Sequence, residues 1–362
     1  MRNKILFINK IQFGYHSDAY MYAKYLKQNY DIISLSLDAN RKRVTTDGVK
    51  NIYIPSFSGY KGRFFTIIRN LVFYVIVLYY ILTTRSLVFV FYFKGAEYLK
   101  RLFPFKRMIL CVCTLSVTNN EELNRAADDR LRKTTSMYDM VIILSEGMRK
   151  RLNLNHENVH IMPLGAEVIS MKDKDYSKFE LLYVGTITNR DVDKTIRGLR
   201  EFIDSNPAVE INYHIVGDGN TPIELQNLKD LVKDLDLYKY VHLYGRIPNT
   251  ELQPFFERCN YGVSFVPITD YYDNQPVTKT FEYAMSGLFV LGTSTKQNLK
   301  VIKKGVNGFL IKDSSADFMK SLEYIRDNYK NIDENKIRDS LTYYKWENLI
   351  NNILSPIISK FF

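Results

Sequence analysis

The stretch that decides the fold is residues 181–220, LLYVGTITNRDVDKTIRGLREFIDSNPAVEINYHIVGDGN. It opens with a short apolar run at 181–184, continues as a helical pattern over 193–205, and closes with a second apolar run at 211–216. A buried strand, an amphipathic helix and another buried strand make up the repeating unit of a parallel sheet that helices cover on both faces.

The same alternation continues along most of the chain. Apolar runs predict strands at residues 4–9, 87–93, 108–112, 140–144, 181–184, 211–216, 241–244, 262–266 and 289–291. Helical periodicity predicts helices at residues 18–28, 146–152, 193–205, 223–235, 249–258, 279–285 and 316–328. We therefore predict the α/β class, with parallel sheets in doubly wound domains.

The strands and helices fall into two series, before and after about residue 170. A Pro-Leu-Gly-Ala segment at 163–166 and a charged segment at 172–175 lie between them and are typical of an interdomain linker. The 362 residues suit two domains of ordinary size. We predict two Rossmann-like domains that face each other across a cleft, with ligands beyond the carboxyl ends of the strands.

Composition restricts the class of partner and the compartment. The net charge of +11 favours a partner with phosphates, but no basic run interleaved with aromatic residues indicates nucleic acid. The three cysteines form no C-x-x-C pair and no disulfide framework, which favours a reducing cytosol. The apolar run at the N-terminus is too short for a signal peptide and is better interpreted as the first strand.

Residues 71–82 are twelve apolar residues without a charge. That is short for a membrane span, which needs about 20. Two interpretations stay open for the helix at 64–82. It packs as a buried helix on the first sheet, or it docks on one leaflet of a membrane with Lys61, Arg63 and Arg69 facing anionic lipid.

Two short motifs suggest metal chemistry and are weak. HENVH at 156–160 matches the zinc protease signature, but its flanks predict the end of a helix and the start of a strand, so the two histidines would not converge. DVD at 191–193 has the spacing with which some glycosyltransferases hold a metal. We interpret Asp193 as the cap of the following helix and His214 as a packed strand residue.

Four loops follow strands of the second series and carry groups suited to an anion. Gly185 leads to Arg190, Gly217 is followed by Asp218, and Gly245 is followed by a basic residue. The fourth loop, PVTKTFE at 276–282, begins a helix with hydroxyl groups and a lysine, where the helix dipole is already positive. Since these loops open on one rim of a parallel sheet, they predict a phosphorylated, nucleotide-like ligand.

In their order along the chain, these segments resemble the family 4 glycosyltransferases of the GT-B fold. VIILSEGMRKRL and VHIMPLGAEV resemble the end of that family's first domain. LYVGTITNR, HIVGDG, VHLYGRIPNTELQPFFERCNYGVSFVP, PVTKTFEYAMSGLFVLGTS and VIKKGVNGFLI resemble its donor domain. The closing YYKWENLINNIL resembles the helix that crosses back to the first domain. The resemblance implies an N-terminal acceptor domain at 1–168, a donor domain at 169–340 and a C-terminal helix at 341–362.

The resemblance also implies roles for individual residues. Arg190 and Lys279 would hold the diphosphate and stabilise the leaving nucleoside diphosphate. Glu282 would bind the donor ribose, and Arg246 with Ile247 would read the base. The further donor residues are Gly185, Thr186, Gly217, Asp218, Asn274, Thr278 and Thr280, where Asn274 stands in place of the family's first glutamate. Gly14 and His16 would line the cleft from the N-terminal domain.

The implied function is transfer of a sugar, with retention and without a metal or other cofactor, from a UDP- or GDP-linked donor. The acceptor would be a glycan or a lipid-linked molecule in cell-surface polysaccharide assembly, reached by peripheral membrane contact from the cytoplasmic side, with no nucleic acid involved. Relatives carry polar residues where this chain has Cys111 and Cys113. The alternatives are a degenerate GT-B protein that binds nucleotide sugar and scaffolds a partner, and a nucleotide-sugar epimerase.

Overall fold

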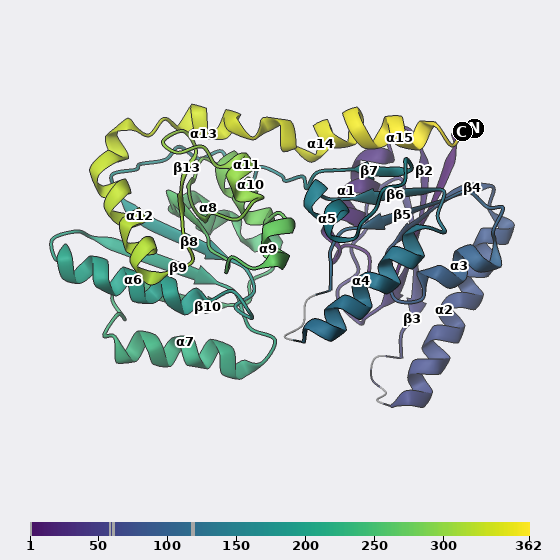
Figure 1. Cartoon of the computed structure of the whole chain (residues 1–362), viewed down its shortest axis with the longest axis horizontal. Helices are drawn as coiled ribbons and strands as arrows, with labels where there is room; N and C mark the ends of the chain where they lie inside the picture. The colour runs from purple at the N-terminus through teal and green to yellow at the C-terminus, as the bar shows by residue number, and fades with distance from the viewer. Residues whose placement is uncertain (1, 58, 60–61, 117–119) are drawn as a thin grey trace. The chain divides into compact units, whose positions relative to one another are not determined.

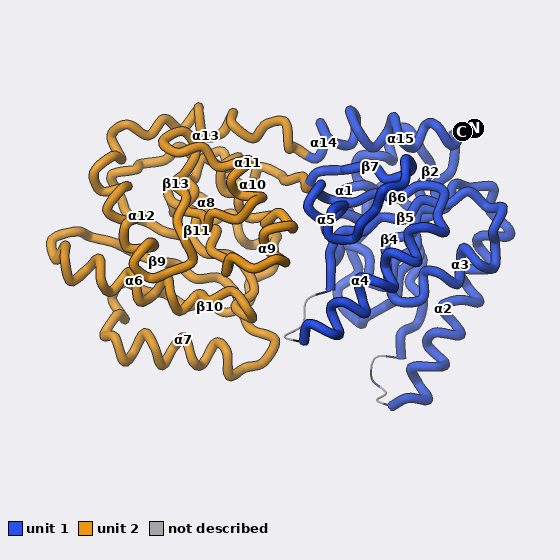
Figure 2. Tube along the Cα trace, in the orientation of Figure 1, with its two compact units in different colours: residues 1–163, 346–362 blue, residues 164–345 orange. Residues whose placement is uncertain are grey.

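The computed structural model describes residues 2–57, 59, 62–116 and 120–362, and the chain divides into two compact units (Figure 2). Unit 1 consists of residues 1–163 and 346–362, and unit 2 of residues 164–345. The boundaries expected from the sequence, 168/169 and 340/341, lie a few residues from these divisions. The last segment of the chain belongs to the same unit as the first strand.

Unit 1 is built on a parallel sheet in the order β3-β2-β1-β4-β5-β6-β7 (Figure 1). Its strands are β1 (Lys4–Asn9), β2 (Asp31–Asp38), β3 (Val49–Pro55), β4 (Ser86–Phe91), β5 (Met108–Val112), β6 (Met140–Ile143) and β7 (Val159–Ile161). Its helices are α1 (Ser17–Leu26), α2 (Arg63–Thr83), α3 (Ala96–Leu102), α4 (Glu121–Thr135), α5 (Glu146–Arg151), α14 (Trp346–Leu349) and α15 (Ser355–Ser359), with a π-helical turn at Ile350–Leu354.

Unit 2 has a second parallel sheet, in the order β10-β9-β8-β11-β12-β13. Its strands are β8 (Phe179–Val184), β9 (Ile211–Val216), β10 (Val241–Gly245), β11 (Tyr261–Ser264), β12 (Phe289–Thr293) and β13 (Gly308–Ile311). Its α-helices are α6 (Val192–Ser205), α7 (Pro222–Asp234), α8 (Gln253–Arg258), α9 (Asp270–Asn274), α10 (Thr278–Met285), α11 (Asn298–Val301), α12 (Ser315–Asn328) and α13 (Glu334–Ser340).

Two parallel, doubly wound sheets confirm the α/β prediction. Local chemistry explains where several helices start: the Ser145 hydroxyl caps α5, the Ser314 hydroxyl caps α12, and Thr221 with Glu224 forms a capping box before Pro222 in α7. The single helix predicted at 249–258 is wrong in detail. A 3₁₀ turn at Asn249–Glu251 precedes α8, because Pro254 lacks the N–H that a continuous helix would use there.

The helix predicted at 64–82 exists as α2, and its burial differs from the first interpretation. One face is buried, through Phe73, Val77 and Ile81, and the other residues of the helix are partly or fully exposed. By length and composition alone, α2 is the one helix in the described part of the chain that could cross a membrane. Only 17% of its most apolar 18-residue stretch is buried. Lys61, expected beside it, lies outside the described residues.

Candidate functional site

The first component of the site is a row of glycines at the carboxyl edge of the unit 2 sheet. The Gly185 N–H donates to the Val216 carbonyl at 3.0 Å, and the Gly217 N–H donates to the Gly245 carbonyl at 2.8 Å. A Cβ atom on Gly217 would lie 1.8 Å from the Gly185 carbonyl oxygen, so a side chain cannot fit there. The ends of β8, β9 and β10 therefore lie side by side, with their backbones open to a ligand.

The second component is the start of α10. Its N-cap position is held by Val277, which has no polar side chain to accept from the first N–H groups of the helix. These groups and the helix dipole favour an anion at this end. The Lys279 ammonium forms an ion pair with Glu282, one turn further on, and both side chains are 17% exposed. One half-buried cation is thus fixed at the start of the helix.

The third component is Arg190, in the loop between β8 and α6. Its neighbours Asn189 and Asp191 both adopt left-handed backbone conformations, at φ 56° and 50°. The guanidinium lies over the ring of Tyr272, 4.6 Å from the centroid. The Tyr272 hydroxyl in turn donates to the Asn189 carbonyl at 3.1 Å. This helix α9 residue therefore holds both the loop and the cation.

Residues from all three components line one pocket of about 220 Å³ in unit 2, with Gly185 as the member of the glycine row. Its walls include Gly185, Arg190, Tyr272, Pro276, Thr278 and Lys279. Two cations, a helix start and a glycine turn at the carboxyl edge of a parallel sheet make a site suited to a diphosphate.

Other predicted donor residues lie outside the walls of this pocket. Thr280 is buried, shares a hydrogen bond with Ser264 at 2.6 Å and donates to Asn298 at 3.0 Å. The Asn274 amide donates to the Asp270 carbonyl at 2.7 Å. The remaining positions are Thr186, whose hydroxyl donates to the Asp218 carbonyl, Gly217 in the glycine row, Asp218 directly after it, Arg246 and Ile247 after β10, and Glu282, which pairs with Lys279.

Sequence reasoning missed the aromatic wall of this pocket. Tyr183 at the end of β8 and the pair Tyr271 and Tyr272 on α9 line it. The doubled tyrosine directly before PVTKTFE was a visible signal, because adjacent aromatic residues beside a cation-rich loop favour cation–π contacts.

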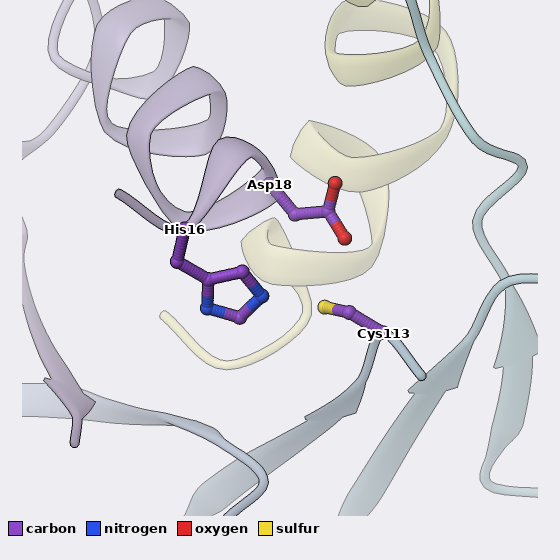
Figure 3. Close-up of side chains that lie close together, drawn as sticks. All are labelled: His16, Asp18 and Cys113. Carbon is purple, nitrogen blue, oxygen red and sulfur yellow. The ribbon is translucent and has the colours of Figure 1, made fainter. Parts of the chain in front are cut away.

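In unit 1, the predicted residues Gly14 and His16 lie in the loop between β1 and α1. Gly14 has φ +91°, and a Cβ atom there would lie 2.4 Å from the Val44 side chain, so glycine is required. His16 occupies the N-cap position of α1. It lies close to Asp18 and to Cys113, which follows β5 (Figure 3).

The hydrogen bonds of His16 make a metal ion a poor fit for this cluster. The Asn9 amide oxygen accepts from the Ile11 N–H at 2.9 Å, so its NH₂ group donates to His16 Nδ1 at 2.8 Å. The proton therefore sits on Nε2, the nitrogen that faces Asp18 and Cys113 in Figure 3. A metal could use Nε2 only after the Asn9 amide had turned over.

The pKa shifts in the cluster favour the neutral form of each group. Burial lowers the pKa of His16 and raises the pKa of Asp18. A hydrogen bond with Cys111, together with burial, raises the pKa of the Cys113 thiol, and the two sulfur atoms are 3.3 Å apart. A protonated thiol is a poor metal ligand, which agrees with the tautomer of His16.

The weaker motifs resolve as structural residues. His214 is buried and uses both ring nitrogens, towards Glu180 at 2.8 Å and Tyr244 at 2.9 Å, so its grouping with Glu180 and Cys259 leaves no lone pair for a metal. His160 lies in β7 while His156 precedes that strand, so HENVH is not helical. The expectation that Asp193 caps α6 is wrong, since Asp191 holds the N-cap position.

Comparison with solved structures defines the class of fold. The chain is similar to sucrose-phosphate synthase from Thermosynechococcus elongatus, with a TM-score of 0.80, 13% identity and 99% of each chain covered. It is similar to HepE from Anabaena in complex with UDP and glucose, with a TM-score of 0.74, 12% identity, and 99% and 100% covered. A third neighbour is the lipopolysaccharide outer core galactosyltransferase WaaB, with a TM-score of 0.66, 16% identity and 99% of each chain covered. The fold is therefore GT-B.

The sequence of unit 2 matches a known family. Residues 178–328 match the family described as "Glycosyl transferases group 1". No protein of curated function matches the chain. Unit 2 thus carries a glycosyltransferase domain of group 1 within a GT-B chain, and these two findings identify an enzyme of the glycosyltransferase class. The finer assignment to family 4 stays a prediction.

Proposed function

We propose that the chain transfers a sugar from a UDP- or GDP-linked donor to a glycan or lipid-linked acceptor in cell-surface polysaccharide assembly. Transfer retains the anomeric configuration and uses no metal. The acceptor is reached from the cytoplasmic side by peripheral contact with the membrane.

The observation that carries the proposal is the convergence of Arg190 and Lys279 on the pocket at the start of α10. A departing nucleoside diphosphate gains negative charge as the bond to the sugar breaks. Two fixed cations and the N–H groups of a helix start stabilise that charge without rearranging. The role that a metal would play is thereby filled by side chains and backbone.

We assign the remaining donor contacts to Glu282, the glycine row, Arg246 and Ile247. Glu282 forms an ion pair with the Lys279 ammonium and lies beside the pocket, where it binds the ribose hydroxyl groups. The glycine row lets the diphosphate approach the backbone. Arg246 and Ile247, directly after the Gly245 turn, read the base from the edge of the same sheet.

Two structural neighbours support the donor and acceptor classes. The HepE structure contains UDP and glucose, and WaaB is a galactosyltransferase of the lipopolysaccharide outer core. Both similarities are of fold, at 12% and 16% identity, so they support the class of substrate and leave the sugar to experiment.

The test is a donor panel. The purified chain is incubated with UDP- and GDP-linked sugars, and release of UDP or GDP is measured with and without a membrane extract that contains lipid-linked acceptors. We expect one donor to raise the melting temperature through binding and to release nucleotide faster when acceptor is present. Binding without any release would favour the scaffold alternative. Folded protein that binds no donor would refute the proposal.

A further inference from the structure

Helix α2 leaves an apolar face uncovered. Phe73, Val77 and Ile81 bury one side of the helix, which contacts β1 and β3. The opposite side carries a row of large apolar side chains that are 56–72% exposed: Phe64, Ile67, Leu71, Val75, Tyr79 and Leu82. Spacings of three and four place them on one stripe, over a helix about 30 Å long. A water-facing stripe of this length needs a partner.

The stripe continues onto helix α3. The rings of Tyr74 and Tyr98 meet edge to face at 6.4 Å, and the Tyr74 hydroxyl donates to the Gly95 carbonyl at 3.0 Å. Tyr98 is 52% exposed, Leu102 is 59% exposed, and Phe105 in the following loop is 99% exposed. A groove lined by Tyr74, Tyr98, Arg101 and Leu102 joins the two helices. We call the stripe on α2 together with Tyr98, Leu102 and Phe105 the α2–α3 face.

The charge of this region is almost entirely positive. Residues 48–120 contain ten Lys or Arg and one acidic residue, Glu97, so one fifth of the chain carries nine of the eleven net positive charges. Arg63 and Arg85 flank the two ends of α2, and Arg101 and Arg107 flank Phe105. All four are exposed. The apolar face is therefore bordered by basic side chains with almost no acids.

The apolar stripe and its basic border together indicate which kind of partner the α2–α3 face binds. A symmetric contact with a second copy would pair the same surface with itself and place arginines against arginines without acids to balance them. A spanning helix is excluded by the packing of α2 on β1 and β3. An anionic bilayer offers acyl chains for the stripe and phosphates for its basic border, and tyrosine and arginine are suited to the boundary between them.

We infer that the α2–α3 face docks the chain on an anionic lipid bilayer, with α2 lying in the plane of the interface and Phe105 inserting beside it. The link between this docking and a lipid-linked acceptor rests on the proposed function; the docking itself does not.

The experiment is flotation of the purified full chain with lipid vesicles. Wild type should float with vesicles that contain phosphatidylglycerol and bind vesicles of phosphatidylcholine alone at least tenfold more weakly, with the difference reduced by high salt. The variant Ile67→Gln/Leu71→Gln/Val75→Gln should lose at least tenfold in binding to the anionic vesicles. Arg63→Gln/Arg101→Gln/Arg107→Gln should lose the preference for the anionic lipid.

The control variant is Met171→Gln/Ile223→Gln/Leu299→Gln, which replaces equally exposed apolar residues of unit 2 and should bind like wild type. Circular dichroism and the unfolding midpoint establish that each variant is folded. Wild type that stays with the soluble fraction would overturn the inference, as would a face variant that floats unchanged.

Light scattering tests the second-copy alternative. A dimer that the Ile67/Leu71/Val75 variant disperses, in a chain that binds no vesicles, would assign the face to self-association and overturn the inference. Nucleotide release is measured separately without vesicles. Docking without release from any donor would leave this inference standing and count against sugar transfer. Release without docking would overturn this inference and leave sugar transfer standing.

Discussion

At the residue scale, the Lys279–Glu282 pair is the most consequential contact in unit 2. Both side chains are partly buried at the start of α10, where the helix dipole disfavours a cation. Glu282 offsets that cost. If the start of α10 binds a diphosphate, as proposed above, the diphosphate would offset the same cost with more charge.

The first prediction concerns this pair. Lys279→Ala and Glu282→Ala should each lower kcat/KM for the donor by about 100-fold or more, since each removes a contact of roughly 3 kcal/mol in the transition state. Steady-state nucleotide release gives the ratio. Lys320→Ala breaks an ion pair of the same i,i+3 spacing with Asp317 on α12 and is the control, with activity unchanged. Wild-type kinetics in both site variants would show that the donor site is elsewhere.

His16 carries a second prediction, about pH. Burial lowers its pKa below the usual value near 6.5. As the pH falls below that value, the unfolded chain binds a proton that the folded chain does not, so the free energy of unfolding should decrease. Above about pH 6.5 this contribution is fully present. Urea unfolding at pH 7.5 and 5.5 should show a larger decrease for wild type than for His16→Gln.

The control for this measurement is His156→Gln, which replaces an exposed histidine and should keep the wild-type decrease. If wild type and His16→Gln lose the same free energy between the two pH values, the neutral, Asn9-bonded form of His16 is not what the fold stabilises.

At the element scale, helices α6 and α12 approach so closely that Gly198 has no room for a side chain. A Cβ atom would lie 2.3 Å from the Ser315 carbonyl oxygen, at the start of α12. In an exposed helix, replacing glycine by alanine would stabilise by about 0.5–1 kcal/mol. At Gly198 the steric clash makes the same replacement destabilising.

The third prediction is that Gly198→Ala lowers the free energy of unfolding by roughly 1–3 kcal/mol, because the two helices must move apart. Urea unfolding gives the value. Glu201→Ala, on the exposed side of α6, should change it little. A Gly198→Ala protein as stable as wild type would mean that α6 and α12 can separate freely.

The sequence predicted well the elements whose apolar residues show a clear pattern, either continuous or with the period of a helix. Long apolar runs such as β5 and amphipathic helices such as α12 have one interpretation. Helix α4 was missed because it is strongly polar, and Leu131 is the only large apolar residue that it buries. Strand β2 was missed because Ser34 and Ser36 interrupt its apolar run, although both are buried.

The sequence predicted the parts of the site that the backbone forms. It predicted less well the parts that depend on where a side chain points. The glycine row could be predicted from the ends of the strands, because glycine has no side-chain conformation to predict. Along α10, successive side chains turn by about 100°, so Thr278 and Lys279 line the pocket while Thr280 faces the sheet and bonds Ser264. A motif of three polar residues does not reveal this turn. The stacking of Arg190 on Tyr272 needed the tertiary fold, because the two residues are far apart in sequence.

At the scale of the whole molecule, unit 1 is completed by residues from the far end of the chain. Residues 346–362 belong to it, although all of unit 2 intervenes. Trp346 is 3% exposed, and its ring meets that of Tyr22 on α1 at 5.8 Å. Tyr22 also contacts Phe89 and Phe91 of β4, so the tryptophan closes an aromatic cluster against the central strands of the sheet. Unit 1 should therefore fold only after residues 346–362 have been synthesised.

The last prediction is that Trp346→Ala destabilises unit 1 by about 3–5 kcal/mol and leaves unit 2 intact, because the lost ring packs against Tyr22 of unit 1. Hydrogen exchange by mass spectrometry should show faster exchange in peptides from β1, α1 and β4, and unchanged exchange in peptides from β8 to β13. Tyr343→Ala is the control: this aromatic residue, three positions earlier, is 56% exposed and belongs to unit 2. Equal acceleration in both units would mean that they unfold as one cooperative body, and no acceleration in unit 1 would mean that the C-terminal segment adds nothing to its stability.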